Sequence, residues 1–254
     1  MTAVAAKLID PALLLSAYAQ GLFPMADGAD DPDVHWVEPR QRAILPLDGF
    51  HLSTSLRKTL IRGALTVTAD RGFADVVALC AAAAPDRPTT WINPVIAGSY
   101  AALHARGYAH SVECWQDGAL VGGLYGVALG RAFFGESMVS RVTDASKIAL
   151  AHLVARLRVG GYQLLDCQFM TPHLARLGAV EIPQRAYLAR LYSVLGSADG
   201  AGADAAAGAL APPSPPFADA DWGALDDLVA GAGFSDGNGS PPGKLIVQLL
   251  TNTS

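Results

Sequence analysis

The feature that most constrains the fold of this sequence is a pair of alternating segments joined by a tight-turn signal. Residues 110–116 and 119–128 alternate between apolar and polar side chains, and Asp117-Gly118 between them is typical of a two-residue β-turn. An apolar segment at 131–135 continues the pattern, and residues 144–160 then carry apolar side chains at helical spacing. Antiparallel strands followed by a long helix place the chain in the α+β class.

The other elements are predicted from capping residues and periodicity. Asp10-Pro11 is a helix N-cap followed by proline at the first helical position, Asn93-Pro94 repeats this arrangement, and Asp144 is predicted to cap the long helix. Further helices are expected at 11–20, 53–62, 73–83, from 94, at 171–177 and from 183, and further strands at 65–69, 162–167 and 180–182.

Two changes in composition divide the chain into three predicted parts. Pro85-Asp86-Arg87-Pro88 separates a small N-terminal domain, residues 1–86, from a larger domain, residues 87–195. Residues 196–254 are rich in Ala, Gly and Pro, and we predict a low-complexity, largely disordered acidic tail there. Near its end the tail contains Trp222, Phe234 and the apolar segment KLIVQLL, which could dock as a short helix or strand.

Charge is distributed unevenly along the chain. The net charge is −5, but seven Asp and one Lys lie in residues 196–254, so residues 1–195 carry a net charge of +1. Arg57, Lys58 and Arg62 lie on one predicted helix, and this helix is a candidate for contacts with phosphate groups. The same pattern is also typical of an ordinary solvated helix, and charge alone does not separate the two interpretations.

Several classes of protein are excluded by what the sequence lacks. No run approaches the roughly 18 apolar residues of a membrane span, and Asp10 and Pro11 interrupt the segment that a signal peptide would need, so a cytoplasmic protein away from membranes is expected. Three scattered cysteines argue against a disulfide framework or a zinc site. There is no Gly-x-Ser-x-Gly, P-loop or His-Glu-x-x-His motif, and no metal is expected.

Polar and aromatic residues gather where the predicted strands end. Glu136 follows the strand at 131–135, Asp166 and Gln168 end the strand at 162–167, and Trp91 opens the second domain. Each of these residues has an ordinary structural explanation when taken alone. Together with their neighbours, from about residue 10 to 195, they resemble the leucyl/phenylalanyl-tRNA–protein transferases through the segments AYAQGLFPM, HWVEPRQRAILP, SLRKTL, TWINP, GYAHSVECW, LVGGLYGVALGRAFFGESMVSR, DASKIAL, LLDCQ and HLARLGAVEIPQRAYL.

This resemblance implies a fold and a reaction. The fold would be a small N-terminal α/β domain followed by an N-acetyltransferase-like (GNAT) domain with a mixed sheet. The reaction would move Leu or Phe, and less readily Met, from aminoacyl-tRNA to acceptor proteins that begin with Arg or Lys, which marks them for degradation. No cofactor is implied, and a monomer is the default expectation.

The resemblance also implies roles for particular residues. Asp166 and Gln168 match the proposed catalytic pair of the family, Glu136 matches a residue that contacts the aminoacyl-nucleotide end, and Trp36 and Trp91 match aromatic residues that hold the terminal adenosine. An apolar pocket for the amino-acid side chain would be lined by Leu124, Phe133, Met138, Leu150, Leu153, Leu157 and Leu165.

The implied reaction is chemically reasonable with these residues. An aminoacyl ester is already activated, and a protein α-amine with a pKa near 7.7–8.0 is partly uncharged at neutral pH, so positioning can supply much of the catalysis. Gln168 could orient the amine through its carbonyl oxygen while Asp166 polarises Gln168 or balances the developing charge. Alternatively, a ribose hydroxyl of the tRNA could carry the proton. Either Glu136 or Asp166 could face the basic residue of the acceptor.

Two rival functions stay open on the sequence alone. An acyl-CoA-dependent N-acetyltransferase would need a glycine-rich pyrophosphate loop before its helix, but the corresponding segment SRVTDASK contains no glycine. A catalytically inactive RNA-binding or adaptor protein would not need Glu136, Asp166 and Gln168 together.

Overall fold

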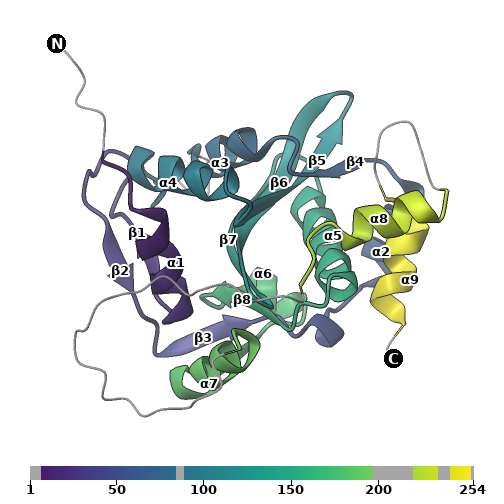
Figure 1. Ribbon diagram of the computed structural model, residues 1–254. Coiled ribbons are helices and arrows are strands. Elements are labelled where there is room, and N and C mark those ends of the chain that lie inside the picture. Colours follow the sequence, from purple (N-terminus) through teal and green to yellow (C-terminus); the bar gives the residue numbers. More distant parts are fainter. Residues whose placement is uncertain (1–6, 84–88, 197–219, 234–240, 253–254) are drawn as a thin grey trace.

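The computed structural model describes residues 7–83, 89–196, 220–233 and 241–252, and these form a mixed α+β structure around one seven-stranded sheet (Figure 1). The strand order is β4-β5-β6-β7-β8-β3-β9. Every neighbouring pair is antiparallel except β7 and β8, which run parallel. The strands are β3 (Gln41–Ile44), β4 (Thr66–Ala69), β5 (Ala109–Gln116), β6 (Ala119–Leu129), β7 (Ala132–Ser140), β8 (Leu164–Gln168) and β9 (Val180–Pro183).

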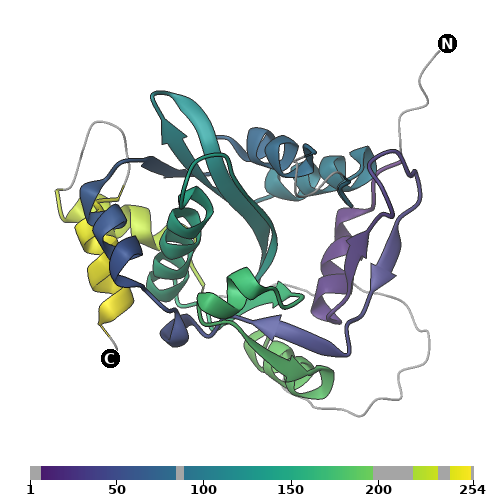
Figure 2. The ribbon, with the colours of Figure 1, turned by 180° about the vertical axis from the view of Figure 1, so that it is seen from behind.

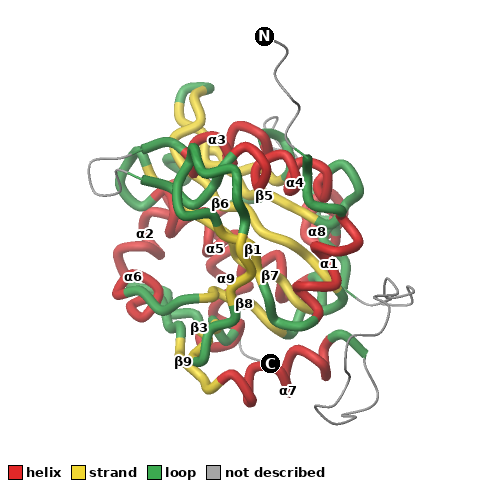
Figure 3. Tube along the Cα trace, turned by 90° about the vertical axis from the view of Figure 1, so that its left-hand side faces the viewer, coloured by secondary structure: helices red, strands yellow, loops and turns green. Residues whose placement is uncertain are grey.

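Helices cover both faces of the sheet. Figures 1 and 2 show α5 against one face, beside α2, α8 and α9, and α3 and α4 against the other. Figure 3 shows α7 along the edge that β3 and β9 form. A separate two-stranded sheet pairs β1 (Phe23–Met25) with β2 (His35–Val37). The helices are α1 (Pro11–Ala19), η1 (Leu47–Gly49), α2 (Thr54–Arg62), α3 (Phe73–Ala81), α4 (Pro94–His104), α5 (Ala145–Val159), α6 (Pro172–Arg176), α7 (Gln184–Val194), α8 (Ala224–Gly231) and α9 (Gly243–Thr251).

The sheet separates two hydrophobic clusters, and its strands supply both because side chains alternate between the faces. Leu124 belongs to the cluster beneath α5, whereas Tyr125 belongs to the cluster beneath α3 and α4. Phe133 and Phe134 divide in the same way. No helix in the described part of the chain is long and apolar enough to cross a membrane.

The mixed α+β class and the predicted order of elements are confirmed. Asp10 and Asn93 cap α1 and α4 through their side chains, as predicted. The predicted strand at 131–135 was too short, because β7 continues to Ser140 and pairs with β6 as far as Gly122. Asp144 stands at the N-cap of α5 but its side chain makes no capping bond, because its backbone is left-handed (φ 65°, ψ 3°) rather than extended as in a typical N-cap. Its carboxylate instead pairs with the ammonium of Lys147 at 2.6 Å.

Residues on both sides of the predicted break at 85–88 contribute to the same sheet. β3 and β4 precede the break, and they pair with β8 and β5, which follow it. The pairs Ala43–Gln168 and Thr66–Trp115 illustrate the two connections. The N-terminal region therefore supplies two strands to the central sheet in addition to the small β1–β2 sheet.

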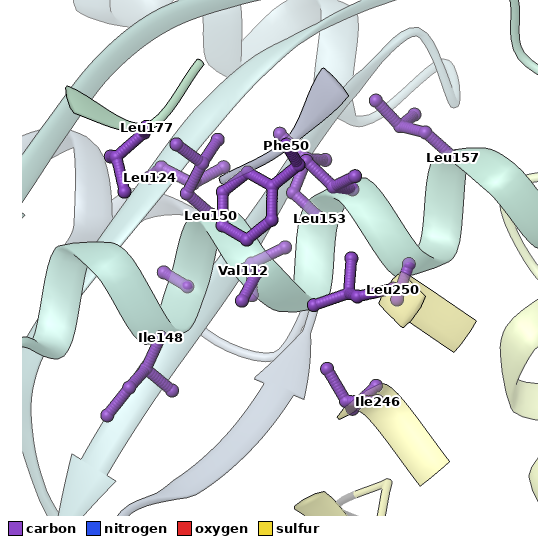
Figure 4. Packing of buried hydrophobic residues seen from close by; sticks show 14 of the residues in the cluster. Phe50, Val112, Leu124, Ile148, Leu150, Leu153, Leu157, Leu177, Ile246 and Leu250 are labelled. Atoms are coloured by element: carbon purple, nitrogen blue, oxygen red, sulfur yellow. The ribbon is translucent and has the colours of Figure 1, made fainter. Parts of the chain in front are cut away.

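The end of the chain docks on the outer face of α5. We predict a largely disordered tail at 196–254, and residues 197–219, 234–240 and 253–254 of it lie outside the described residues. The remainder contains the helices α8 and α9, and the apolar segment KLIVQLL forms most of the amphipathic helix α9. Figure 4 shows Ile246 and Leu250 of α9 beside α5. The guanidinium of Arg156 forms two 2.7 Å hydrogen bonds with the carboxylate of Asp226, and the Trp222 ring stacks on Phe133 with centroids 5.5 Å apart.

Candidate active site

A pocket of about 450 Å³ opens where β7 and β8 separate. These strands pair only from Ala132–Leu164 to Phe134–Asp166, after which β7 stays paired with β6 alone. The gap is bounded by α5, α6 and Trp91 as well as by the two strands. Its lining residues are Trp91, Leu124, Tyr125, Gly135, Glu136, Ser137, Met138, Leu150, Leu153, Leu165, Cys167, Gln168, Phe169, Thr171, His173 and Leu174.

The pocket combines an apolar part with a small set of polar groups. Leucines from β6, α5, β8 and α6 form the apolar part, while Glu136 and Gln168 supply a carboxyl and an amide. Leu124 and Leu150 lie close together in Figure 4. A concave, mainly apolar site with a few converging polar groups is the usual form of a pocket for a small organic ligand.

A β-bulge places Glu136. Tyr125 pairs with Ser137, and the next residue on β6, Gly126, pairs with Gly135, so Glu136 has no partner on β6. Such bulges redirect a side chain and are common beside active sites. The Glu136 side chain is consequently buried among hydrogen-bonding groups rather than held in the regular alternation of the strand.

Two tyrosines and one glutamine surround the Glu136 carboxyl group. The Tyr18 hydroxyl donates to Oε1 at 2.7 Å, the Tyr100 hydroxyl donates to Oε2 at 2.6 Å, and the two hydroxyl oxygens lie 2.7 Å apart. The Gln168 amide nitrogen also donates to Oε1, at 2.8 Å. This bond orients the Gln168 side chain and leaves its amide oxygen available as an acceptor.

The triangle of Tyr18, Tyr100 and Glu136 favours a protonated carboxyl group. Its three oxygen–oxygen contacts need three hydrogen atoms, whereas the two hydroxyl groups supply two. Burial raises the pKa of Glu136 to about 7, although the hydrogen bonds from Tyr100, Tyr18 and Gln168 act in the opposite direction. In the neutral acid, Oε2 carries the proton and donates to the Tyr100 hydroxyl, which in turn donates to the Tyr18 hydroxyl, so all three contacts hold a hydrogen. The raised pKa makes this neutral form of Glu136 accessible near neutral pH.

This protonation predicts a pH-dependent stability difference between the wild type and Glu136→Gln. The folded pKa of about 7 exceeds the unfolded value of 4.5, so the stabilising contribution is present below pH 4.5 and is lost as the pH rises to 7. Over this pH range the wild type is expected to lose about 3 kcal/mol of its free energy of unfolding. The Glu136→Gln variant avoids this loss because its amide does not ionise. Urea unfolding from pH 4.5 to 8 measures this, and an equal pH dependence in both proteins would contradict the protonation.

Asp166 lies behind the pocket wall in a buried ion pair. The Arg42 guanidinium donates from Nε to Oδ1 at 2.9 Å and from Nη2 to Oδ2 at 2.6 Å, and the Tyr187 hydroxyl donates to Oδ2 at 2.8 Å. The backbone N–H of Gln168 donates to Oδ1 at 2.8 Å. Asp166 thus fixes the backbone of Gln168, which has a left-handed φ of 62°.

The structure brings together eight of the residues that the sequence analysis assigns to the site. These are Trp91, Leu124, Glu136, Met138, Leu150, Leu153, Leu165 and Gln168. Asp166 is fully buried outside the lining, and Phe133 packs on Tyr162 and Trp222. Leu157 lies further along α5 than Leu150 and Leu153, away from the lining (Figure 4).

The other predicted site residues lie apart from the pocket. Trp36 is 38 % exposed on β2, and it lines a separate depression with Leu8 and Leu13. Arg57, Lys58 and Arg62 project from the exposed face of α2, and none of them forms an ion pair with a carboxylate of the described residues.

Several residues around the pocket carry no sequence signal that would identify them. Tyr18 and Tyr100 occupy apolar helix faces, where tyrosine ordinarily fills a core, and Arg42 lies in a short strand. Tyr18 and Tyr100 lie 118 and 36 residues away in sequence from their hydrogen-bond partner Glu136. Arg42 lies 124 residues away from its partner Asp166. A contact at such separations leaves no periodic pattern in a single sequence.

The site therefore has the form expected of an enzyme that binds a ligand with an apolar side chain and a polar end. Residues 44–192 match the sequence model described as leucyl/phenylalanyl-tRNA protein transferase, and residues 8–40 match that of its N-terminal domain. The chain belongs to the leucyl/phenylalanyl-tRNA–protein transferase family.

Two relatives with that name match almost the whole chain. The leucyl/phenylalanyl-tRNA–protein transferase of Rhizorhabdus wittichii is 57 % identical over 253 residues, which cover 98 % of this chain and 100 % of the relative. That of Novosphingobium aromaticivorans is 52 % identical over 271 aligned positions, which cover all of both chains. Both alignments include the part of the chain after residue 195 that the resemblance of motifs does not reach.

Proposed function

We propose that this protein transfers leucine or phenylalanine, and less readily methionine, from aminoacyl-tRNA to the N-terminal Arg or Lys of acceptor proteins and so marks them for degradation. The observation that carries the proposal is the pocket in which an apolar end meets Glu136 and Gln168, in a chain that belongs to this family. We place the reaction in the cytoplasm and assign it to a monomer.

The proposal includes a GNAT-like fold for the larger domain, with residues 1–86 as the smaller domain and residues 196–254 as a tail. The parallel pair β7–β8 within an otherwise antiparallel sheet supports this fold, as does the opening of a ligand pocket between these two strands. The donor would enter this opening, because it is the place where the sheet gives access to buried polar groups.

Within the pocket, the apolar residues would hold the side chain of the transferred amino acid. Trp91 would stack on the terminal adenosine. Trp36, which lines a separate depression, is the second aromatic residue that we propose to contact this nucleoside. The Gln168 amide oxygen would accept a hydrogen bond from the attacking amine of the acceptor. Glu136 would act on the aminoacyl end through Gln168, whose amide it holds.

The donor ester supplies the driving force for this reaction. The amine attacks the ester carbonyl, the bond from the carbonyl carbon to the ribose oxygen breaks, and one proton passes from the nitrogen to the leaving ribose oxygen, which becomes a hydroxyl. The leaving oxygen can receive a proton directly from the amine or from the neighbouring ribose hydroxyl, which then takes up the proton of the amine. Gln168 contributes position rather than basicity, because a neutral amide is a very weak base.

Asp166 enters this scheme as a positioning residue. Its carboxylate is engaged by Arg42, Tyr187 and the backbone of Gln168, and it does not line the pocket. The tRNA itself would be held by phosphate contacts from Arg57, Lys58 and Arg62, which carry no sequence information.

The proposed pocket can be tested by the choice of donor. Leu153→Ala widens the apolar end, and we expect the ratio of phenylalanine to leucine transfer to rise about tenfold, since a methylene-sized change in such a pocket is worth about 1–3 kcal/mol. Leu157→Ala is the matched control, because Leu157 is equally buried on the same helix but does not line the pocket.

The measurement is kcat/KM with Phe-tRNA and Leu-tRNA and an acceptor that begins with Arg. Ile-tRNA and Val-tRNA complete the panel, and they should be poor donors because branching at Cβ crowds the pocket entrance. An unchanged ratio in Leu153→Ala, or an equal change in Leu157→Ala, would show that this pocket does not select the amino acid.

A further inference from the structure

A second cavity of about 380 Å³ adjoins the active-site pocket through His173, which lines both. Three elements that are distant in sequence form its walls: the start of α2, the first turn of α5, and α6. Figure 2 shows α6 beside α5, with α2 on the far side of α5. We call this second cavity the His173 cavity. Its lining residues are His51, Ser53, Leu56, Lys147, His173, Arg176 and Leu177.

The His173 cavity has an electrostatic character that suits an anion. Lys147 and Arg176 contribute two cationic groups, His51 and His173 contribute imidazole rings, and no carboxylate is among the lining residues. The Lys147 ammonium is partly compensated by Asp144 at 2.6 Å, whereas Arg176 makes no ion pair with any carboxylate in the described ranges. The cavity therefore keeps a positive balance.

His173 offers a polar atom without a protein partner. Its Nε2 atom is buried, and it has no hydrogen-bond partner among the described residues. Burial lowers the pKa of His173, and the nearby cations Lys147 and Arg176 lower it further. A bound anion would supply both the missing partner and the missing negative charge.

The position of the cavity favours a phosphate of the donor as this anion. It lies between the pocket proposed to hold the terminal adenosine and the helix α2, whose exposed cations Arg57, Lys58 and Arg62 are proposed to contact tRNA phosphates. A single-stranded tRNA end that left the pocket toward α2 would pass His173, the residue that lines both cavities, with its first backbone phosphate.

We infer that the His173 cavity binds the phosphodiester that links the terminal adenosine of the donor to the preceding nucleotide. The inference rests on the proposed function, because it takes aminoacyl-tRNA as the donor. Arg176 and Lys147 would hold the phosphate oxygens, and His173 would donate from Nε2. Such contacts fix the register of the donor without reading its sequence.

Two non-transferable donors test this inference. One is the 3′-amide analogue of leucyl-adenosine with a free 5′-hydroxyl, and the other carries a cytidine on its 5′ side through a phosphodiester. We expect the wild type to bind the second about tenfold more tightly, as one charge-assisted contact would allow. Arg176→Gln should remove most of this difference without changing the affinity for leucyl-adenosine.

Isothermal titration calorimetry gives the dissociation constant of each analogue for each protein, and Arg190→Gln is the matched control because Arg190 is an exposed arginine on α7. For the cytidine-bearing donor, the slope of log K against log salt should also fall by about 0.7 in Arg176→Gln, as for one lost phosphate contact on a single strand.

The outcomes separate the inference from the proposed function. Equal affinity of the wild type for the two analogues, or an unchanged difference in Arg176→Gln and Lys147→Gln, would overturn the phosphate site alone. An equal loss for both analogues in Arg176→Gln would assign Arg176 a structural role and also overturn it. Failure of the wild type to bind leucyl-adenosine would contradict the proposed function itself.

Discussion

Replacing Gln168 with alanine is expected to lower the single-turnover rate of leucine transfer by about 10²-fold, which is the typical effect of misplacing a reacting group by about 1 Å. The amide of Gln168 is held by Glu136 at 2.8 Å, and its oxygen is the acceptor that we propose for the attacking amine. Truncation removes that acceptor without touching the apolar part of the pocket. The rate is measured by rapid quench with enzyme in excess over Leu-tRNA.

Two controls separate this catalytic effect from a loss of structure. Gln168 has a left-handed backbone, which alanine adopts less readily than asparagine, so Gln168→Asn keeps both an amide and a tolerated conformation. Its shorter side chain should give an intermediate rate. Binding of the leucyl-adenosine amide should be retained in both variants. A wild-type rate in Gln168→Ala would remove Gln168 from the mechanism.

The largest expected effect on stability follows from replacing Arg42 with methionine. The side chains of Arg42 and Asp166 are almost completely buried. If one of them is removed, water therefore cannot reach the other to solvate its charge. Removing the guanidinium leaves a buried carboxylate without its counterion, which typically costs about 3–5 kcal/mol. The Arg42 guanidinium also lies over the rings of Phe23 and Tyr187, so its loss affects packing as well.

Urea unfolding of Arg42→Met, Asp166→Asn and the double variant forms a thermodynamic cycle. The double variant should be more stable than the sum of the single effects indicates, because it buries no uncompensated charge. A loss below about 1 kcal/mol in Arg42→Met would show that the pair is not essential for stability.

The rate of single-turnover transfer by Asp166→Asn separately tests the role of Asp166 in the reaction. An unchanged rate would exclude an electrostatic contribution of the Asp166 carboxylate to the reaction.

Local elements of this fold are predictable because their signals are local. The caps at Asp10 and Asn93 and the turn at Asp117-Gly118 each depend on residues within a few positions, and the structure contains all of them. The docking of α9 follows from one amphipathic segment. Where the backbone differs from the conformation that the signal assumes, prediction fails, as at Asp144, whose left-handed backbone is not that of a typical N-cap.

The candidate site is predictable only in part from the residues themselves. Motif resemblance identifies Glu136, Gln168 and most of the apolar lining, whereas spacing alone gives no reason for the bulge that redirects Glu136. The Arg42–Asp166 pair joins strands 124 residues apart in sequence. Leu157 fits the helical pattern of Leu150 and Leu153, but the pocket ends before it reaches that turn of α5.

The most direct test of the proposed reaction is transfer of labelled leucine from Leu-tRNA to a purified protein with an exposed N-terminal Arg. The same protein beginning with Gly is the control for the acceptor, and Gln168→Ala is the control for the site. We predict label in the Arg-started protein alone, at its N-terminus, and strongly reduced label with the variant. Absence of label with folded wild-type enzyme, or equal label in both acceptors, would contradict the proposed function.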